Sequence, residues 1–290
     1  MTLSEGFTIA ATSGPPGPLV LASPHSGRDY PDGFVATSRL TLPQLRRAED
    51  AFVDALLAPA VLAGAPLIAA RFGRSWLDLN RAPEELDPAM FVEPLSEHPD
   101  QSGDRVAAGL GVVPRIAGFG LDIYPGRLRL ADAQARLAEV HAPYHAALGR
   151  LIECARARHG YAVLLDCHSM PTPPAAGGTV PEIVLGDLHG CSAAPSVTAA
   201  IEAHWRRAGF RVARNVPYAG GFTTAHHGRT VDGVHVVQIE IDRALYMDPA
   251  RLVRHAGFAR IATVLGTLAE HLLATVPKLG LAPPWRIAAE

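Results

Sequence analysis

The sequence predicts an α/β fold, in which helices flank a central sheet that is mostly parallel but mixed. Short apolar runs of strand length alternate with longer segments of helical periodicity, and this alternation is typical of a parallel sheet covered by helices. Hydrophobic residues make up 48% of the 290 residues and charged residues only 19%, which is enough apolar material for a large core. The sequence has no internal repeat and no compositional break, so we expect residues 1–290 to form a single domain.

The chain then divides into elements in order. Residues 1–18 are polar or rich in proline and glycine, and we expect a surface extension there. Apolar or alternating runs predict strands at 19–23, 66–70, 71–81, 161–169, 182–186, 210–213 and 234–242. Helical periodicity predicts helices at 41–63, 131–158, 196–208 and 249–275, with a kink at Pro143. Residues 82–130 have no sustained period, and irregular stretches of that length are usually functional or mobile.

Bulk composition argues against several classes of partner. The net charge of -2 and the pI near 6.7 give no general attraction to nucleic acid or to an anionic membrane. Three cysteines without metal-type pair spacing favour a reducing compartment over a disulfide framework. The start of the chain has no signal-peptide pattern, and no run approaches membrane-spanning length. We therefore expect a cytoplasmic protein that binds neither nucleic acid nor membrane; the oligomeric state is left open.

Two histidines and a glutamate lie in or just after predicted strands. Asp166 and His168 end one buried run, His25 follows the first strand, and Glu240 lies within the last. Ligands of open α/β sheets bind beyond the carboxyl ends of the strands. A catalytic zinc takes three nitrogen or oxygen ligands and a water, and a nearby carboxylate can take a proton from that water. Together with Asp50, these residues predict a metal-dependent hydrolase site.

Other histidines and a cysteine have competing interpretations. His141 and His145 have the i, i+4 spacing of metal ligands, but a proline between them disturbs the helix that this spacing requires. His226 lies in a Gly-rich loop, where surface exposure is the default and substrate contact the alternative. Cys167, beside His168, allows a thiol-hydrolase interpretation. Neighbouring residues on a strand point to opposite faces, however. If His168 faces the site, Cys167 faces the core.

Three arginines suit an acidic ligand. Arg74 and Arg81 bracket a Trp-Leu-Asp-Leu-Asn run, and Arg127 follows an Asp-Ile-Tyr-Pro-Gly run. A guanidinium group holds a carboxylate bidentately, so Arg81 with Asn80 would suit the carboxylate of a substrate. The alternative is a surface ion pair, for example between Arg74 and Asp78.

Several short motifs occur in order between residues 23 and 247. They are Ser23-Pro-His-Ser-Gly27, Glu49-Asp-Ala-Phe-Val-Asp54, Leu77-Asp-Leu-Asn-Arg81, Pro143-Tyr-His145, Leu165-Asp-Cys-His-Ser169, Gly220-Gly221 with Thr224, and Gln238-Ile-Glu240 followed by Leu245-Tyr-Met247. The ordered set resembles the N-formylglutamate amidohydrolase family, which belongs to the broader zinc-carboxypeptidase and aspartoacylase type of fold. This resemblance covers most of the chain.

The resemblance implies an activity and a metal site. The activity would be metal-dependent hydrolysis of an N-acyl amino acid, such as N-formyl-L-glutamate to formate and glutamate, in histidine degradation. One zinc or other divalent ion per chain would be held by His25, Asp50 and His168. Asp29 and Glu49 remain the alternative third ligands.

The resemblance also implies catalytic and substrate-binding residues. Glu240 would be the general base, and Asn80 and Arg81 would hold the carboxylate of a small acidic substrate. Further substrate contacts are expected from Arg74, Arg127, Thr224 and His226. The deformylases of the family are expected to have a basic residue near Ala225, so the alanine here leaves the acyl group and the amino acid open.

Two functions from other classes compete with a metal-dependent amidohydrolase. A non-catalytic protein could bind a small acidic ligand through the same arginines, and it would have no need of Glu240. A Cys-dependent hydrolase would use Cys167, and a chelator would not inhibit it.

Overall fold

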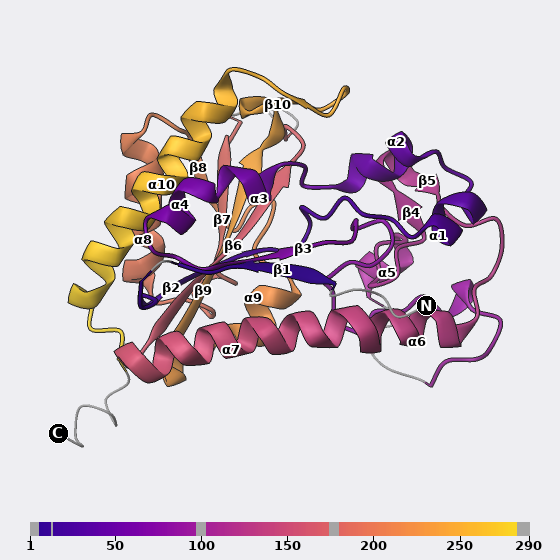
Figure 1. Ribbon diagram of the computed structural model, residues 1–290, viewed down its shortest axis with the longest axis horizontal. Helices are drawn as coiled ribbons and strands as arrows, with labels where there is room; N and C mark the ends of the chain where they lie inside the picture. Colours follow the sequence, from indigo (N-terminus) through magenta and orange to yellow (C-terminus); the bar gives the residue numbers. More distant parts are fainter. Residues whose placement is uncertain (1–5, 13, 97–102, 174–179, 283–290) are drawn as a thin grey trace. The chain divides into compact units, whose positions relative to one another are not determined.

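The computed structural model describes residues 6–12, 14–96, 103–173 and 180–282 (Figure 1). It contains a seven-stranded sheet with the strand order β1-β3-β2-β6-β9-β7-β8. The strands are β1 (Phe7–Ala10), β2 (Leu19–Ser23), β3 (Leu67–Ala70), β6 (Ala162–Met170), β7 (Ile183–Gly186), β8 (Val212–Arg214) and β9 (Val234–Asp242). β2 pairs with β6, β6 with β9 and β7 with β8 in parallel, whereas β7 and β9 are antiparallel. This mixed, mainly parallel sheet flanked by helices confirms the predicted fold class.

The central strands are buried along their whole length. Every residue of β2, β6 and β9 is buried, as expected for strands covered on both faces. The parallel register places Asp166 opposite Gln238 and His168 opposite Glu240. The polar residues near the carboxyl ends of β6 and β9 are therefore neighbours on the same side of the sheet.

The helices account for most of the remaining regular structure. They are α1 (Asp32–Thr37), α2 (Leu42–Leu45), α3 (Val53–Leu56), α4 (Ala58–Leu62), α5 (Asp104–Ala107), α6 (Leu130–Arg136), α7 (Ala142–His159), α8 (Pro195–Arg207), α9 (Phe222–His227) and α10 (Gly257–Thr275). Two small antiparallel pairs join β4 (Ile116–Ala117) to β5 (Leu121–Asp122), and β10 (Met247–Asp248) to β11 (Val253–Arg254). The second pair occupies part of the stretch predicted as the start of the last helix, which begins only at Gly257.

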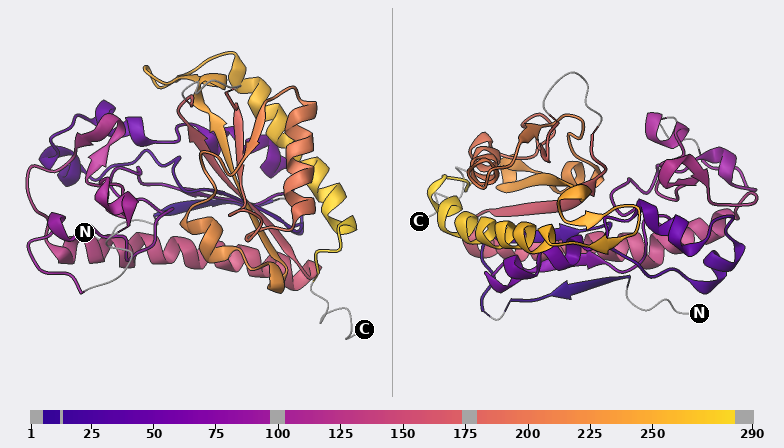
Figure 2. Two further views of the ribbon diagram at one scale, coloured as in Figure 1. Left: turned by 180° about the vertical axis from the view of Figure 1, so that it is seen from behind. Right: turned by 90° about the horizontal axis from the view of Figure 1, so that it is seen from above.

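Helix α10 packs against α3, α4 and α8 (Figure 2). Its residues Ile261, Leu265, Leu268 and Leu272 are buried. By length and apolar composition alone, Gly257–Lys278 could also cross a membrane, so the expectation that no run approaches that length is wrong. The packing of its apolar residues explains the composition, because the core helix of a globular protein needs the same residues.

Contacts between Cα atoms divide the chain into two compact units. The first comprises Met1–Thr8, Pro24–Ala51 and Ala69–Ala147, and it holds α1, α2, α5, α6 and the β4–β5 pair. The second comprises Ile9–Ser23, Phe52–Ile68 and Leu148–Glu290, and it holds β2, β6 to β9 and the helices α3, α4, α8, α9 and α10. The segments of the two units interleave along the chain. The single domain expected over 1–290 stays a prediction.

The helix predicted over 41–63 is instead a series of short helices, interrupted around Asp50. Glu49 has an extended backbone, and Phe52 has a left-handed one with φ 68°. The backbone N–H of Asp50 donates to the carbonyl of His25 at 2.9 Å, which is a partner outside any helix. Asp50 therefore lies outside any helix, although the pattern predicts a helix through it.

The strand predicted over 71–81 is also wrong. A single bridge joins Phe72 to Asp29, and turns and irregular backbone follow. Asp78, Asn80 and Arg81 are buried. The alternation of apolar and polar residues here reflects polar side chains with buried partners, not a strand with one face in solvent.

Candidate metal centre

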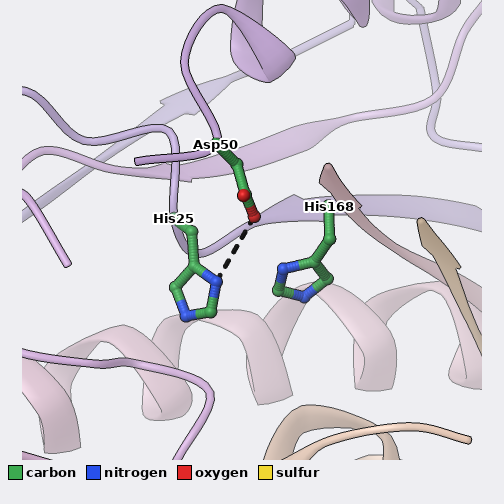
Figure 3. Close-up of side chains that lie close together, drawn as sticks. All are labelled: His25, Asp50 and His168. Carbon is green, nitrogen blue, oxygen red and sulfur yellow. Dashed lines mark ion pairs between the residues drawn. The ribbon is translucent and has the colours of Figure 1, made fainter. Parts of the chain in front are cut away.

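His25, Asp50 and His168 come together in a buried cluster (Figure 3). Each offers one ligand atom, and these atoms lie within 4.8 Å of one another. All three residues are at most 2% exposed. The three residues expected to bind the metal are thus the three that the fold assembles.

The spacing of two of these atoms fits a metal site better than a direct hydrogen bond. His25 Nδ1 lies 3.4 Å from Asp50 Oδ2, whereas N–H···O hydrogen bonds are usually about 2.9 Å long. Ligand atoms at about 2.1 Å from a tetrahedral zinc would be about 3.4 Å apart. Two imidazoles and a carboxylate are also a usual protein donor set for a catalytic zinc. The residues present therefore fit a zinc ion.

Local backbone contacts position His25 and Asp50. His25 follows β2 by two residues, and its carbonyl accepts the Asp50 N–H at 2.9 Å. Gly27 allows the loop after His25 to approach Phe72, because a Cβ at Gly27 would overlap the Phe72 carbonyl. The loop is thus fixed on both sides of the histidine.

Asp78 orients the ring of His25. Its Oδ1 lies 2.6 Å from His25 Nε2, and its side chain is buried. Burial acts to raise the pKa of Asp78, but the charges of Arg74, His25 and Arg81 outweigh it and hold that pKa well below its usual range. A carboxylate accepts hydrogen bonds, so Nε2 carries the proton and Nδ1 presents its lone pair to the cluster. Sequence reasoning considered Asp78 only as a partner of Arg74.

Asp166 lies beside His168, without the hydrogen bond that joins Asp78 to His25. Its Oδ2 lies 3.1 Å from His168 Nε2, an ion-pair distance, and its side chain is fully buried. The two residues are i and i+2 on β6 and so project from the same face. The sequence shows both as polar residues at a strand end, and the structure places the buried carboxylate next to the ring.

Glu240 lies beside His168 in the register of β6 and β9. Its side chain is 8% exposed, and its Oε1 accepts a hydrogen bond from Gln238 Nε2 at 2.9 Å. It does not belong to the group of ligand atoms found among the described residues. The role of Glu240 as the general base stays a prediction.

The alternative third ligands are occupied elsewhere. Asp29 is exposed and pairs with Arg71 at 2.7 Å. Glu49 is buried, and its carboxylate accepts hydrogen bonds from Arg46 Nε and from the Tyr30 hydroxyl. Asp50 is therefore the carboxylate that the structure brings to the two histidines.

Asn80 and Arg81 are the residues expected to hold a substrate carboxylate, and we refer to this expected pair as the carboxylate clamp. Both are buried, and Arg81 donates from Nε to the Leu110 carbonyl and from Nη1 to the Asn80 carbonyl, each at 2.9 Å. Burial lowers the pKa of Arg81, and the charge of Arg74 acts in the same direction. Arg74 donates to Asp78 Oδ2 at 2.9 Å. The ion pair considered from sequence therefore exists, but its carboxylate is buried and not on the surface.

The comparisons with known proteins now place the chain. The family model for N-formylglutamate amidohydrolase matches residues 17–247. The chain belongs to the N-formylglutamate amidohydrolase family. An N-formylglutamate deformylase of Pseudomonas aeruginosa is 30% identical over 268 residues, which cover 89% of this chain and 93% of the relative. One from Pseudomonas putida is 28% identical over 240 residues, which cover 80% and 82%.

Solved structures agree with this assignment. The crystal structure of N-formylglutamate amidohydrolase from Ralstonia eutropha JMP134 has a TM-score of 0.89 and 34% identity, covering 95% of this chain and 99% of that one. A gene product of Agrobacterium tumefaciens has a TM-score of 0.67 and 22% identity over 94% of this chain and 96% of its own, which shows a shared fold alone. The family resemblance read from the motifs is confirmed.

The remaining residues expected to contact substrate differ in their surroundings. Arg127 is exposed in the segment before α6, and His226 is exposed on α9, where its ring stacks on Phe222 at 4.8 Å. Thr224 is fully buried and packs against Gly220, whose φ of 136° favours glycine. Surface exposure, the default interpretation for His226, is what the structure shows. Substrate contact by these residues stays a prediction.

Cys167 has the properties of a core residue. It is fully buried, and its Sγ donates to the Leu165 carbonyl at 3.7 Å. Burial raises the pKa of its thiol, with the charge of Asp166 adding to the effect. A nucleophilic cysteine needs an accessible thiolate, so this environment argues against a Cys-dependent member of the family.

Sequence reasoning also missed Arg243. This residue follows β9 directly, and its Nε donates to the hydroxyl of Ser169 at 3.1 Å. Ser169 is the neighbour of His168 on β6. The position of Arg243 between the Gln238-Ile-Glu240 and Leu245-Tyr-Met247 motifs is the signal that could have drawn attention to it.

Proposed function

We propose that this protein hydrolyses the amide bond of N-formyl-L-glutamate, or of a closely related N-acyl amino acid, to the free amino acid and a carboxylate. The observation that carries the proposal is the buried cluster of His25, Asp50 and His168. Membership of the N-formylglutamate amidohydrolase family supports the choice of substrate, as do the names of the Pseudomonas relatives.

The three ligands and their partners have separate tasks in this proposal. His25, Asp50 and His168 would hold one divalent ion, such as zinc, which when bound lowers the pKa of water and polarises a carbonyl. Asp78 keeps the Nε2 proton on His25, so that Nδ1 of His25 can bind the ion. Asp166 places a negative charge 3.1 Å from Nε2 of His168.

Glu240 would move the proton. Its carboxylate takes a proton from the attacking water as the hydroxyl oxygen bonds to the formyl carbon. It then returns that proton to the amide nitrogen, and the C–N bond breaks to give formate and glutamate. Gln238 donates to Glu240 Oε1 and so restricts the rotation of the carboxylate.

Arg81 and Asn80 would hold a carboxylate of the substrate. Arg81 is a buried cation whose pKa is lowered by burial, so a second anion beside it would offset part of that cost. A guanidinium group can bind such an anion bidentately. The net charge of -2 gives the whole chain no attraction for anions, and recognition must therefore be local.

A hydrolysis assay tests this function directly. Zinc-loaded protein should release formate from N-formyl-L-glutamate, with a kcat/KM that is higher than for N-acetyl-L-glutamate or N-formyl-L-leucine. A chelator should abolish turnover, and added zinc should restore it. Chelator-resistant turnover, or no turnover of any of the three substrates, would contradict the proposal.

Replacing Arg81 should change specificity more than it changes chemistry. We expect Arg81→Ala to lower kcat/KM for N-formyl-L-glutamate by roughly ten- to a hundredfold, the scale of one charge-assisted bond. Arg81→Lys should restore only part of the lost kcat/KM, because lysine has the positive charge but cannot donate two parallel hydrogen bonds to a carboxylate. The matched control is Arg115→Ala, which removes an exposed guanidinium paired with Asp122. An equal loss on the free acid and on an amide-capped substrate would show that Arg81 only braces the fold.

A further inference from the structure

The backbone around the carboxylate clamp has no regular structure to hold it. Residues 79–81 are buried and lie in turns or irregular backbone, where each buried carbonyl needs a hydrogen-bond partner. All three carbonyls of this segment accept from side chains. Leu79 O lies 2.8 Å from His145 Nε2, Asn80 O accepts from Arg81 Nη1 at 2.9 Å, and Arg81 O lies 2.9 Å from His141 Nε2.

The two histidines come from one helical stretch. His141 ends a π-helical turn, Leu137–His141, and His145 lies in the first turns of α7. This π-helical turn comes just before Pro143, where the sequence predicts a kink, and π turns accommodate such disturbances. The imidazole centroids are 4.6 Å apart, and both side chains are at most 7% exposed.

The hydrogen-bond partners of these two imidazoles determine which ring nitrogen carries the proton. A backbone carbonyl only accepts hydrogen bonds, so Nε2 of each imidazole must carry a proton. Neither histidine belongs to the ligand group found among the described residues. The i, i+4 spacing that resembles a pair of metal ligands therefore serves a different purpose, which is to present two donors to one neighbouring segment.

We infer that His141 and His145 are positioning residues for the carboxylate clamp, an inference that rests on the function proposed above. They bind the carbonyls on either side of Asn80, and so fix the segment from which the side chains of Asn80 and Arg81 project. The Asn80 N–H donates to Asp78 Oδ1 at 2.9 Å, the oxygen that also binds His25 Nε2. The clamp is thereby held in register with a candidate metal ligand.

This arrangement predicts an effect on selectivity. A binding group must be held within about 0.5 Å of its productive position. Without His145, the buried Leu79 carbonyl would lose its partner, and the segment would shift to find another. Such a shift moves Arg81 and Asn80, which recognise the carboxylate, more than it moves the residues that act on the amide bond.

The test compares kcat/KM for N-formyl-L-glutamate with kcat/KM for the same compound capped as an amide at its α-carboxylate. For zinc-loaded His145→Phe, we expect the ratio of the two to fall about tenfold, the scale of one buried hydrogen bond. His145→Gln should retain most of the ratio, because its amide nitrogen can donate from nearly the same place. The matched control is His159→Phe, which removes a similar bond, from His159 Nε2 to the Pro16 carbonyl, at the other end of α7.

The results for the His145 variants either support or contradict the positioning role. A ratio unchanged in His145→Phe, or an equal loss on both substrates that His145→Gln does not repair, overturns the positioning role. If His145→Phe fails to fold, His145→Gln and His145→Asn make the same comparison, since asparagine is too short to reach the carbonyl. If the zinc-loaded wild type cleaves neither substrate, the proposed function fails and this inference falls with it. Cleavage by the wild type with an unaltered ratio in the variant contradicts the inference alone.

Discussion

Replacing Glu240 by glutamine should lower kcat by ~10²-fold or more while the protein keeps its metal. Glutamine has nearly the same shape, and its side-chain oxygen can still accept the hydrogen bond from Gln238. What it lacks is a carboxylate that takes a proton from water and returns it to the leaving nitrogen. The measurement is formate release together with elemental analysis of the same sample.

A neighbouring carboxylate provides the control for this variant. Asp242 lies two residues further along β9 and is also buried, but it accepts from Thr172 and from the Ala244 N–H. Asp242→Asn should retain far more activity than Glu240→Gln. Full activity in Glu240→Gln would exclude Glu240 as the base. Inactivity of both the wild type and the variant would favour a protein that only binds its ligand. Loss of zinc in Glu240→Gln would show that Glu240 is a ligand.

Asp78→Asn should weaken zinc binding by about 10- to 100-fold, the usual effect of removing a carboxylate that orients a ligating histidine. Asp78 Oδ1 accepts from His25 Nε2 at 2.6 Å, and Oδ2 accepts from Arg74. An amide cannot accept from both sides. If its NH₂ group faces the ring, His25 must move its proton to Nδ1, the nitrogen that would bind zinc. Competition with a chelator of known affinity measures the loss.

A buried aspartate outside the cluster controls for general damage. Asp187 accepts hydrogen bonds from Thr198, Asn215 and the Gly190 N–H. Asp187→Asn should lower the free energy of unfolding but leave the zinc affinity of the folded protein unchanged. An Asp78→Asn variant with wild-type zinc affinity, or an equal weakening by both substitutions, would contradict the orienting role of Asp78.

The sequence predicts the sheet and the ends of its central strands because these depend on local patterns. Long apolar runs indicate buried strands, and the first polar residues after them mark the edge where ligands gather. His25 and His168 follow from that rule alone. Asp50 required the family resemblance, since its local pattern indicated a helix and the structure has an interruption there.

The segment around the carboxylate clamp could not be predicted because its partners are distant in the chain. Its alternating pattern resembles a half-exposed strand, yet the polar residues are buried. Their environment is completed by His141 and His145, roughly sixty residues further along. No local pattern records such a contact. The same limit applies to Asp78, whose role depends on a histidine in another loop.

Zinc content shows directly whether His168 helps to hold a metal ion. The wild type and His168→Ala would be dialysed against the same low concentration of zinc, with His235→Ala, another buried histidine of the sheet, as the matched control. We expect about one zinc per chain in the wild type and in His235→Ala. In folded His168→Ala, we expect a loss of most of that zinc. Undiminished zinc in His168→Ala would contradict a metal site formed by His25, Asp50 and His168.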